Sequence, residues 1–283
     1  METSGSIAAG FDERAAGYDD DVWHVRYARR LVELARPGAG SRVLDAATGT
    51  GMAARAAALA AGPSGHVTGV DISDGMLHRA RRHPPEAGAA PVELIRADAS
   101  RLPHLPDRSF DLVLCSAGML YLPVAAALAE WWRLLRPGGT VGFSTMRAGF
   151  PRIAGLFRGL AAAHGLVLDD PVAPLGTPQQ CRRVLADAGF VPGEVIGGTV
   201  RFSRADAAKA WHAHTRGVHR AAFATLGPGP AHAFEQEFAA VLAERLAADE
   251  ERLLTAEVLY AFGIRQLPDP GHRPGPQAVR RGC

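Results

Sequence analysis

The chain has 283 residues, of which 47% are hydrophobic, and its formal net charge at pH 7 is +2. This apolar content is enough for a full core and excludes a disordered chain, and the near balance of charge excludes a basic footprint for nucleic acid. Three cysteines without a Cys-x-x-Cys spacing exclude a disulfide framework and a zinc site. We therefore expect no metal and no nucleic-acid partner, and the oligomeric state stays open.

The N-terminal segment, residues 1–40, is expected to form a helical lid. It has no basic stretch followed by an apolar one, and no run of the chain approaches 18 apolar residues. We therefore expect no membrane association and a cytoplasmic location. Helical spacing of apolar side chains over 27–34 predicts a helix that ends at the turn 37–40.

Residues 41–146 alternate between strand and helix patterns and are expected to form the core. Strands are predicted over 42–46, 66–71, 92–96, 110–115 and 140–145. Helices are predicted over 52–61, 75–82 and 123–135, with Ser73 as the N-cap of the second. This regular alternation predicts a parallel sheet that helices cover on both faces.

The C-terminal part, residues 147–267, is expected to complete the core and to supply helices that cover a substrate. The patterns predict helices over 151–164 and 177–188, a strand over 194–202 and a helical stretch over 205–251 that breaks at 227–230. The stretch 255–265 is mixed, and a final strand is predicted over its core, 258–263. The expected fold is α/β, a doubly wound, seven-stranded, mostly parallel Rossmann-like sheet with a helical lid. Residues 268–283, rich in Pro, Gly and Arg, are expected to be a disordered tail.

The turn after the first predicted strand carries the strongest functional signal. Gly49 and Gly51 have no Cβ, so the backbone N–H groups of this turn can approach a ligand closely. Asp71 ends the second strand about 20 residues later, where a carboxylate can accept hydrogen bonds from both ribose hydroxyls. Together these features predict a βαβ unit that binds an adenosine-type cofactor.

The glycine turn by itself admits NAD, because residues 49–54 fit the pattern G-x-G-x-x-A. A short-chain dehydrogenase would also need a Tyr-x-x-x-Lys pair. Lys209 is the only lysine of the sequence, and the residue four positions before it is Ala205. An NAD-dependent oxidoreductase is therefore the weaker alternative.

Three further stretches follow the glycine turn in order, at 96–103, 106–111 and 134–139. Together with the turn they resemble the class I S-adenosylmethionine (SAM) methyltransferases, most closely the ubiquinone/menaquinone-biosynthesis-type branch. The resemblance covers roughly residues 41–146 and implies that this core binds SAM.

The resemblance also implies how the cofactor is held. Asp45 would lie near the methionyl ammonium through water, Asp71 would hold the ribose hydroxyls, and Asp98 would accept from the adenine amino group. The other implied contacts are Tyr18 over the cofactor's carboxylate, Ala47, Gly49 and Gly51 under its methionine part, Ile72, Met76 and Ala99 around the adenine, and Cys115 and Ser116 beside the methionine.

A late apolar stripe is typical either of a pocket wall that carries a base or of a helix that faces the core. On a helical period, one face holds Ala208, Trp211, His212, Thr215, His219, Ala222 and Phe223. His214 falls on the opposite side of such a helix. The candidate bases are His212 and His219 on this stripe, His24 in the lid, and Tyr121 after the fourth strand.

The expected activity is SAM-dependent methyl transfer to O or C of a small, largely apolar acceptor, a specialised metabolite. Methyl transfer needs mainly the alignment of the reacting atoms, and a base is needed only when the acceptor is protonated. The same fold and SAM site would serve a non-methylating cyclase or isomerase, or a non-catalytic SAM-binding protein. The sequence does not separate the methyltransferase from the cyclase or isomerase, whereas the histidine stripe argues against the non-catalytic protein.

Overall fold

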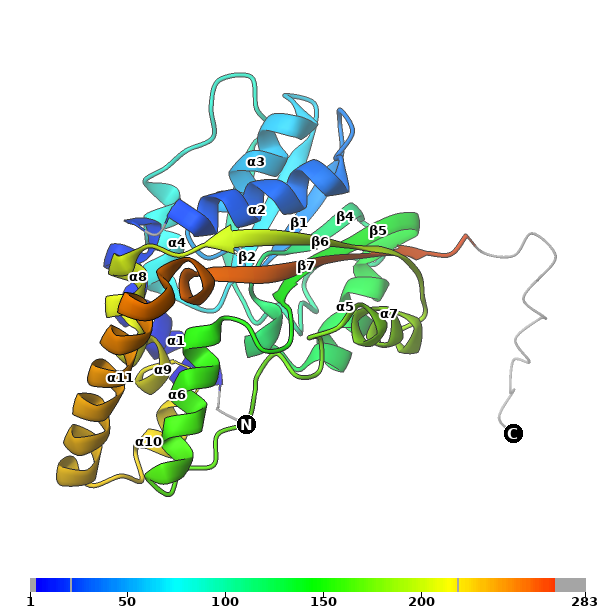
Figure 1. Cartoon of the computed structure of the whole chain (residues 1–283). Helices are drawn as coiled ribbons and strands as arrows, with labels where there is room; N and C mark the ends of the chain where they lie inside the picture. The colour runs from blue at the N-terminus through cyan, green and yellow to red at the C-terminus, as the bar shows by residue number, and fades with distance from the viewer. Residues whose placement is uncertain (1–3, 21, 218, 268–283) are drawn as a thin grey trace, which may run out of the picture.

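The structure is a computed structural model that describes residues 4–20, 22–217 and 219–267 (Figure 1). Its centre is a seven-stranded sheet of order β3-β2-β1-β4-β5-β7-β6. The first five strands are parallel, and β7 is antiparallel to both β5 and β6. The strands are β1 Arg42–Ala46, β2 His66–Asp71, β3 Val92–Arg96, β4 Phe110–Cys115, β5 Leu135–Met146, β6 Phe190–Arg201 and β7 Thr255–Arg265.

Helices precede and follow these strands in the order of a doubly wound fold. They are α1 Ser4–Arg14, α2 Val22–Ala35, α3 Met52–Ala61, α4 Asp74–Arg81, α5 Val124–Leu134, α6 Arg152–Ala163, α7 Pro178–Asp187, α8 Arg204–Ala208, α9 Ala210–Thr215, α10 Arg220–Phe223 and α11 Pro228–Leu254. Two 3-10 helices, η1 Ala15–Asp20 and η2 Met119–Tyr121, complete the described chain. Among the described residues, no helix is both long and apolar enough to cross a membrane.

The core lies on both faces of the sheet, because successive strand residues point to opposite sides. Val43 packs with α2 and α3 on one face, and Leu44 packs with α5 and α7 on the other. Figure 1 shows these two layers above and below the sheet. The expectation of a doubly wound α/β sheet of seven strands is confirmed.

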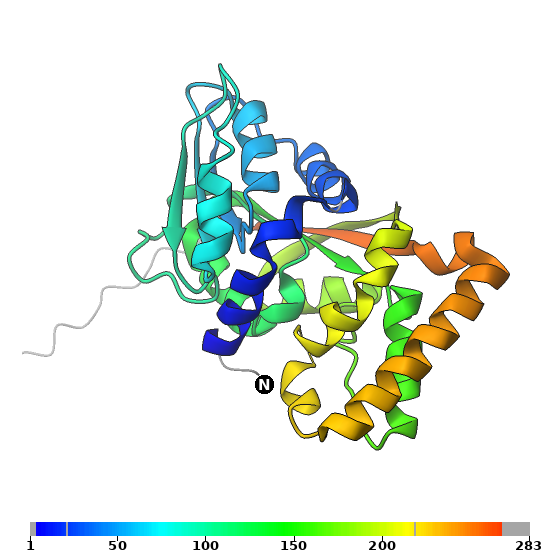
Figure 2. The ribbon, with the colours of Figure 1, turned by 90° about the vertical axis from the view of Figure 1, so that its left-hand side faces the viewer.

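A helical part extends past one end of the sheet and consists of α6 and α8 to α11 (Figure 1). Its core is aromatic, and Phe157 of α6 contacts the rings of Phe234 and Phe238 of α11. The N-terminal helix α1 lies between α4 and the α8–α10 region (Figure 2). The chain thus folds a helical cover over the end of the sheet where the parallel strands β1, β2 and β4 stop.

The sequence patterns placed some boundaries wrongly. A strand was predicted over 140–145, but β5 begins at Leu135, with a bulge against β4. The stretch 205–226 was predicted as one helical run, but the chain forms three short helices there. The predicted tail, 268–283, lies outside the described residues.

Candidate functional site

The turn between β1 and α3 is left-handed at three positions, with φ of 57° at Ala47, 55° at Gly49 and 81° at Gly51. It is held by two backbone bonds, from Thr48 N to Val70 O at 2.8 Å and from Gly51 N to Thr48 O at 2.9 Å. Glycine adopts this backbone region without strain, whereas alanine there costs roughly 1–2 kcal/mol. The turn therefore stores strain at Ala47, as functional sites often do.

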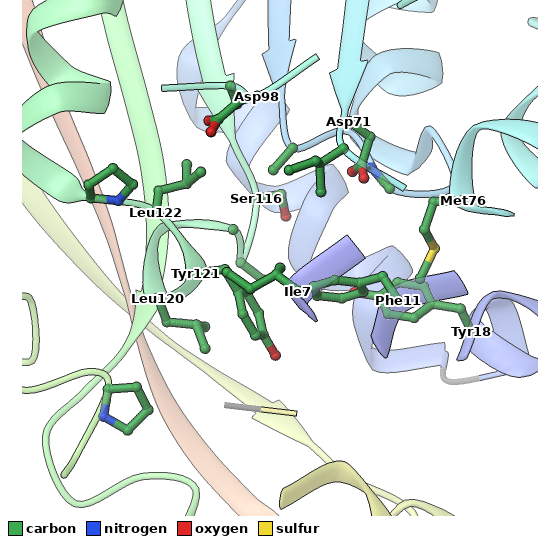
Figure 3. A pocket seen from close by; sticks show the side chains of 18 residues that line it. Ile7, Phe11, Tyr18, Asp71, Met76, Asp98, Ser116, Leu120, Tyr121 and Leu122 are labelled. Atoms are coloured by element: carbon green, nitrogen blue, oxygen red, sulfur yellow. Dashed lines mark hydrogen bonds between the residues drawn. The ribbon is translucent and has the colours of Figure 1, made fainter. Parts of the chain in front are cut away.

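Asp71 closes this turn from the end of β2. Its Oδ2 accepts from Gly49 N at 2.8 Å, and its Oδ1 accepts from Ser73 N at 2.9 Å. Each carboxylate oxygen has further lone pairs, and the side chain points toward the cavity (Figure 3). Burial raises the pKa of Asp71, and the backbone donors oppose that shift. The carboxylate is thus fixed in direction before any ligand binds.

Asp45 lies under the same turn and is almost fully buried. Thr48 Oγ1 donates to its Oδ2 at 2.6 Å, whereas its Oδ1 has no hydrogen-bond partner among the described residues. Burial raises the pKa of Asp45 to about 7. A buried carboxylate with one oxygen unsatisfied is suited to receive a cationic group.

A cavity of about 600 Å³ opens above the carboxyl ends of β1, β2 and β4. Asp71 and Asp98 project into it from the sheet side, and Ile7, Phe11 and Tyr18 face them from the N-terminal helices (Figure 3). Asp98 is held in a tight turn, because its Oδ1 accepts from Ser100 N at 2.9 Å and from Ser100 Oγ at 2.6 Å. We call this space the cofactor cavity; its walls also include Ala47, Gly49, Ile72, Met76, Ala99 and Ser116.

Two further cavities adjoin it. One, of about 40 Å³, is lined by Asp45, Gly49, Thr50, Ser116 and His24. The other, of about 250 Å³, lies between the sheet, α2 and the helical part, and we call it the second cavity. Tyr18 and Ala117 line all three cavities, so the three spaces meet at these two residues.

Comparison with known proteins agrees with this geometry. Residues 43–139 match a family model described as a methyltransferase domain. An aklanonic acid methyltransferase of Streptomyces sp. strain C5 is 38% identical over 151 residues, which are 51% of this chain and 68% of that protein. A demethylmenaquinone methyltransferase of Listeria monocytogenes is 40% identical over 117 residues, 41% of this chain and 49% of that protein.

The chain belongs to the class I SAM-dependent methyltransferases. It spans about half the length of the demethylmenaquinone enzymes that it matches. Among solved structures, a candidate methyltransferase of Bacillus halodurans C-125 superposes with a TM-score of 0.58 at 18% identity, covering 85% of this chain and 99% of that one. A SAM-dependent methyltransferase of Aquifex aeolicus gives 0.51 at 14% identity, covering 84% and 89%. These two superpositions show the shared fold.

The residues of this methyltransferase fit SAM at the cofactor cavity. Asp71 presents two oxygens, held by backbone donors, at the wall of the cofactor cavity, and Asp45 lines the small cavity beside it. Of the residues expected to hold the cofactor, nine line the cofactor cavity: Tyr18, Ala47, Gly49, Asp71, Ile72, Met76, Asp98, Ala99 and Ser116. Asp45, Gly51 and Cys115 do not line it. Asp45 lines the small cavity, Gly51 is the N-cap of α3, and Cys115 is fully buried in the core.

The second cavity holds three of the four predicted bases. His24, Tyr121 and His219 line it, and Tyr121 also lines the cofactor cavity. His212 is exposed and does not line the cavity, so its expected place beside His219 was wrong. The reason is that α9 ends at Thr215 and α10 begins only at Arg220, so no continuous helix carries both histidines.

His214 takes the place that was expected for His212. It lines the second cavity and stacks on Phe157, with ring centroids 4.4 Å apart. Burial lowers the pKa of His214 to about 3, and burial also lowers that of His24 to about 3. Both imidazoles are therefore neutral at physiological pH. They can donate and accept hydrogen bonds, but they hold a proton weakly.

The sequence patterns missed several residues of both cavities. Phe11 packs edge-on against Tyr121 with centroids 4.8 Å apart, and this pair covers the cofactor cavity. Arg158 and Asp170 form an ion pair of 2.7 Å at the rim of the second cavity. The amphipathic helix at 151–164 was visible in the sequence, but the loop that brings Asp170 to it has no local signal.

Proposed function

We propose that this methyltransferase methylates an oxygen or a carbon of a small, largely apolar acceptor, a specialised metabolite, held in the second cavity. One observation carries the proposal: the second cavity meets the cofactor cavity at Tyr18 and Ala117, next to the turn that carries Ser116. The walls of the second cavity are mainly aromatic and aliphatic, with rings from Trp23, Tyr27, Phe150 and Phe202. Such walls favour an apolar ligand over a protein or nucleic-acid chain.

The relatives support the same class of acceptor. One is named for aklanonic acid and others for demethylmenaquinone, and both names denote small organic compounds. The second cavity has about 250 Å³, which is the space that about eight water molecules fill in the liquid. This volume suits a compact aromatic acceptor.

SAM, when bound, supplies a methyl group that its sulfonium already activates. The chain then has to bind the acceptor, orient it toward the cofactor and exclude water. Asp71 would hold the ribose and Asp45 would lie near the ammonium, and the ring pair of Phe11 and Tyr121 covers the cavity. Alignment of this kind accounts for much of the rate in a displacement reaction.

His24 is the imidazole nearest the transfer point, because it lines both the second cavity and the small cavity beside Asp45. It stacks on Tyr18 with ring centroids 4.5 Å apart. An imidazole with a pKa of about 3 orients a hydroxyl well but retains its proton poorly. We therefore expect acceptors that ionise near neutral pH to react fastest.

The proposal is tested first at the cofactor. Isothermal titration compares S-adenosylhomocysteine and NADH on wild type and on Asp71→Ala, with the exposed Asp74→Ala as control. Because hydrogen bonds to a charged group are worth about 1.5–3 kcal/mol each, we expect roughly 100-fold weaker S-adenosylhomocysteine binding in Asp71→Ala. Preference for NADH would overturn the proposal.

Acceptor chemistry is tested by transfer of label from methyl-labelled SAM to hydroxylated naphthoquinones and to aromatic acids. Label in the organic phase, with one equivalent of S-adenosylhomocysteine formed, supports methyl transfer. S-adenosylhomocysteine binding without any label transfer, together with rearrangement of the same compounds, would instead favour a non-methylating cyclase or isomerase.

A further inference from the structure

The second cavity contains a buried imidazole with an unsatisfied nitrogen. His219 is only 6% exposed, and its Nε2 has no hydrogen-bond partner among the residues that the structure describes. The side chain lines the second cavity. Buried polar atoms are nearly always hydrogen-bonded, so an unpaired one beside a cavity indicates a group that a ligand satisfies.

The walls around His219 are flat and aromatic. Its ring is nearly parallel to that of Phe157, at 8° and 6.3 Å between centroids. The ring centroid of His214 lies 5.8 Å from that of His219, and the His214 ring is also stacked on Phe157. The ion pair of Arg158 and Asp170 borders the same wall. The lining around His219 therefore combines apolar ring faces with the unsatisfied Nε2 of this histidine.

The two histidines do not lie where the second cavity adjoins the other two cavities. His214 and His219 line the second cavity but neither the cofactor cavity nor the small cavity beside Asp45. The residues that line both the second cavity and the cofactor cavity are Tyr18, Ala117, Leu120, Tyr121 and Pro171, and neither histidine is among them. An acceptor that reaches both places must carry a polar group away from the atom that is methylated.

We propose that the acceptor is a two-ended aromatic compound with a hydroxyl at the end remote from the methylated atom, and that His219 Nε2 holds this hydroxyl. A hydroxyl both donates and accepts, so it satisfies Nε2 in either tautomer of the ring. His214 and Phe157 form the ring face against which this end of the acceptor packs. The inference rests on the proposed function, because it assumes that the second cavity binds the acceptor.

The test compares two probes that differ by one remote hydroxyl, para-hydroxybiphenyl and para,para′-dihydroxybiphenyl. Each is titrated into wild type saturated with S-adenosylhomocysteine. Because leaving a buried polar group unpaired weakens binding, we expect the dihydroxy probe to bind about tenfold tighter. In His219→Phe the two probes should bind within about twofold of each other, because no imidazole remains to hold the second hydroxyl.

Two further variants control the comparison. His219→Gln keeps a polar group and should retain part of the tenfold preference. His212→Phe changes the exposed histidine outside the cavity and should retain all of it. Unchanged S-adenosylhomocysteine affinity and thermal unfolding in each variant show that the fold is intact.

The outcomes separate this inference from the proposed function. Equal affinity of the two probes in wild type, no saturable binding of either, or a preference that persists in His219→Phe would each overturn the inference. Failure of wild type to bind S-adenosylhomocysteine would overturn the proposed function. Cofactor binding together with a tenfold preference that depends on His219 supports both.

Discussion

Asp45 shows how one buried carboxyl can couple cofactor binding to protons. With a pKa of about 7 it is mainly protonated at pH 6 in the cofactor-free chain. An ammonium placed beside it favours the carboxylate, so the proton must leave when the ligand binds. We expect S-adenosylhomocysteine to release close to one proton at pH 6 and much less at pH 8. Calorimetry in buffers of different ionisation enthalpy measures this number.

Asp45→Asn should bind the same ligand without proton release, and Asp74→Asn should release protons as wild type does. Asp74 is a fair control because it is exposed and pairs with Arg96 on the surface. Binding at pH 6 with no proton released from wild type would contradict a protonated Asp45 in the cofactor-free chain.

Ala47 and Gly118 pack closely at the turn after β1. Ala47 is left-handed, and a Cβ added to Gly118 would lie 2.8 Å from Ala47 Cβ and 2.8 Å from Cys115 Sγ. Gly118 itself has φ −90°, so the obstacle to a side chain there is space alone. We expect Gly118→Ala to lower the free energy of unfolding by about 1–3 kcal/mol through overpacking.

The double variant Gly118→Ala with Ala47→Gly removes one of the two close contacts and the strained alanine. Urea unfolding should therefore show it to be more stable than Gly118→Ala alone. Gly155→Ala, on a helix with open space around it, is the matched control and should unfold no earlier than wild type. An unchanged unfolding midpoint in Gly118→Ala would show that the loop yields without cost.

At the scale of elements, the carboxylate of Asp12 in α1 holds the start of α4. Asp12 Oδ1 accepts from Ser73 Oγ at 2.5 Å and from Gly75 N at 2.8 Å, so it caps α4 from another helix. Removing such a cap costs about 1 kcal/mol, and α1 carries Ile7 and Phe11 over the cofactor cavity. We expect Asp12→Ala to weaken S-adenosylhomocysteine binding about fivefold and to speed amide exchange in 4–14.

Glu13→Ala is the neighbouring control, because the ion pair of Glu13 with Arg220 is long, at 3.9 Å. It should leave both the ligand affinity and the exchange of α1 close to wild type. Loss of global stability in Asp12→Ala without any change in cofactor affinity would show that the contact supports the fold and not the closed lid.

The parallel core followed from local patterns, and the helical part did not. The strand and helix limits within 42–134 depend on apolar periods, turns and caps close in the sequence, such as Ser73, which accepts from Met76 N as predicted. Helix α9 ends where the backbone turns at Arg216 and Gly217, and no proline marks that point. The stripe 205–223 therefore matched a helical period without forming one helix.

The two halves of the site differ in the same way. Most cofactor residues follow a glycine turn or a strand end, so their neighbours in sequence already indicate their place. The second cavity instead joins α2, α6, α9 and the loop before α7, which are far apart in the chain. Contacts such as that of His214 with Phe157 depend on packing over a long sequence separation, which no local pattern encodes.

At the scale of the whole molecule, the site holds three histidines whose pKa is lowered in the folded chain, His24, His214 and His219, and two carboxyls whose pKa is raised, Asp45 and Asp71. The two kinds of group have opposite effects on how folding depends on pH. His24 and His214 have a pKa near 6.5 when unfolded and about 3 when folded. Between these values the unfolded chain binds more protons, so the stability present above pH 6.5 is lost as pH falls. The pKa of Asp45 rises from 3.8 in the unfolded chain to about 7 in the folded chain, so the stability that this carboxyl contributes is lost as the pH rises from 3.8 to about 7.

Between pH 4 and 6.5 the three histidines outnumber the two carboxyls, so the free energy of unfolding of the cofactor-free chain should rise with pH. A group that is protonated in one state and deprotonated in the other changes the free energy of unfolding by about 1.4 kcal/mol per pH unit. His214→Asn should make the rise of this free energy with pH less steep by that amount, because it removes a group that favours folding at high pH. Asp45→Asn should make the rise steeper, because it removes a group that favours folding at low pH. Urea unfolding of the three proteins at several pH values measures these slopes. Parallel slopes in wild type and both variants would mean that these side chains are solvated in the folded chain, and the walls of the second cavity would then be open to water.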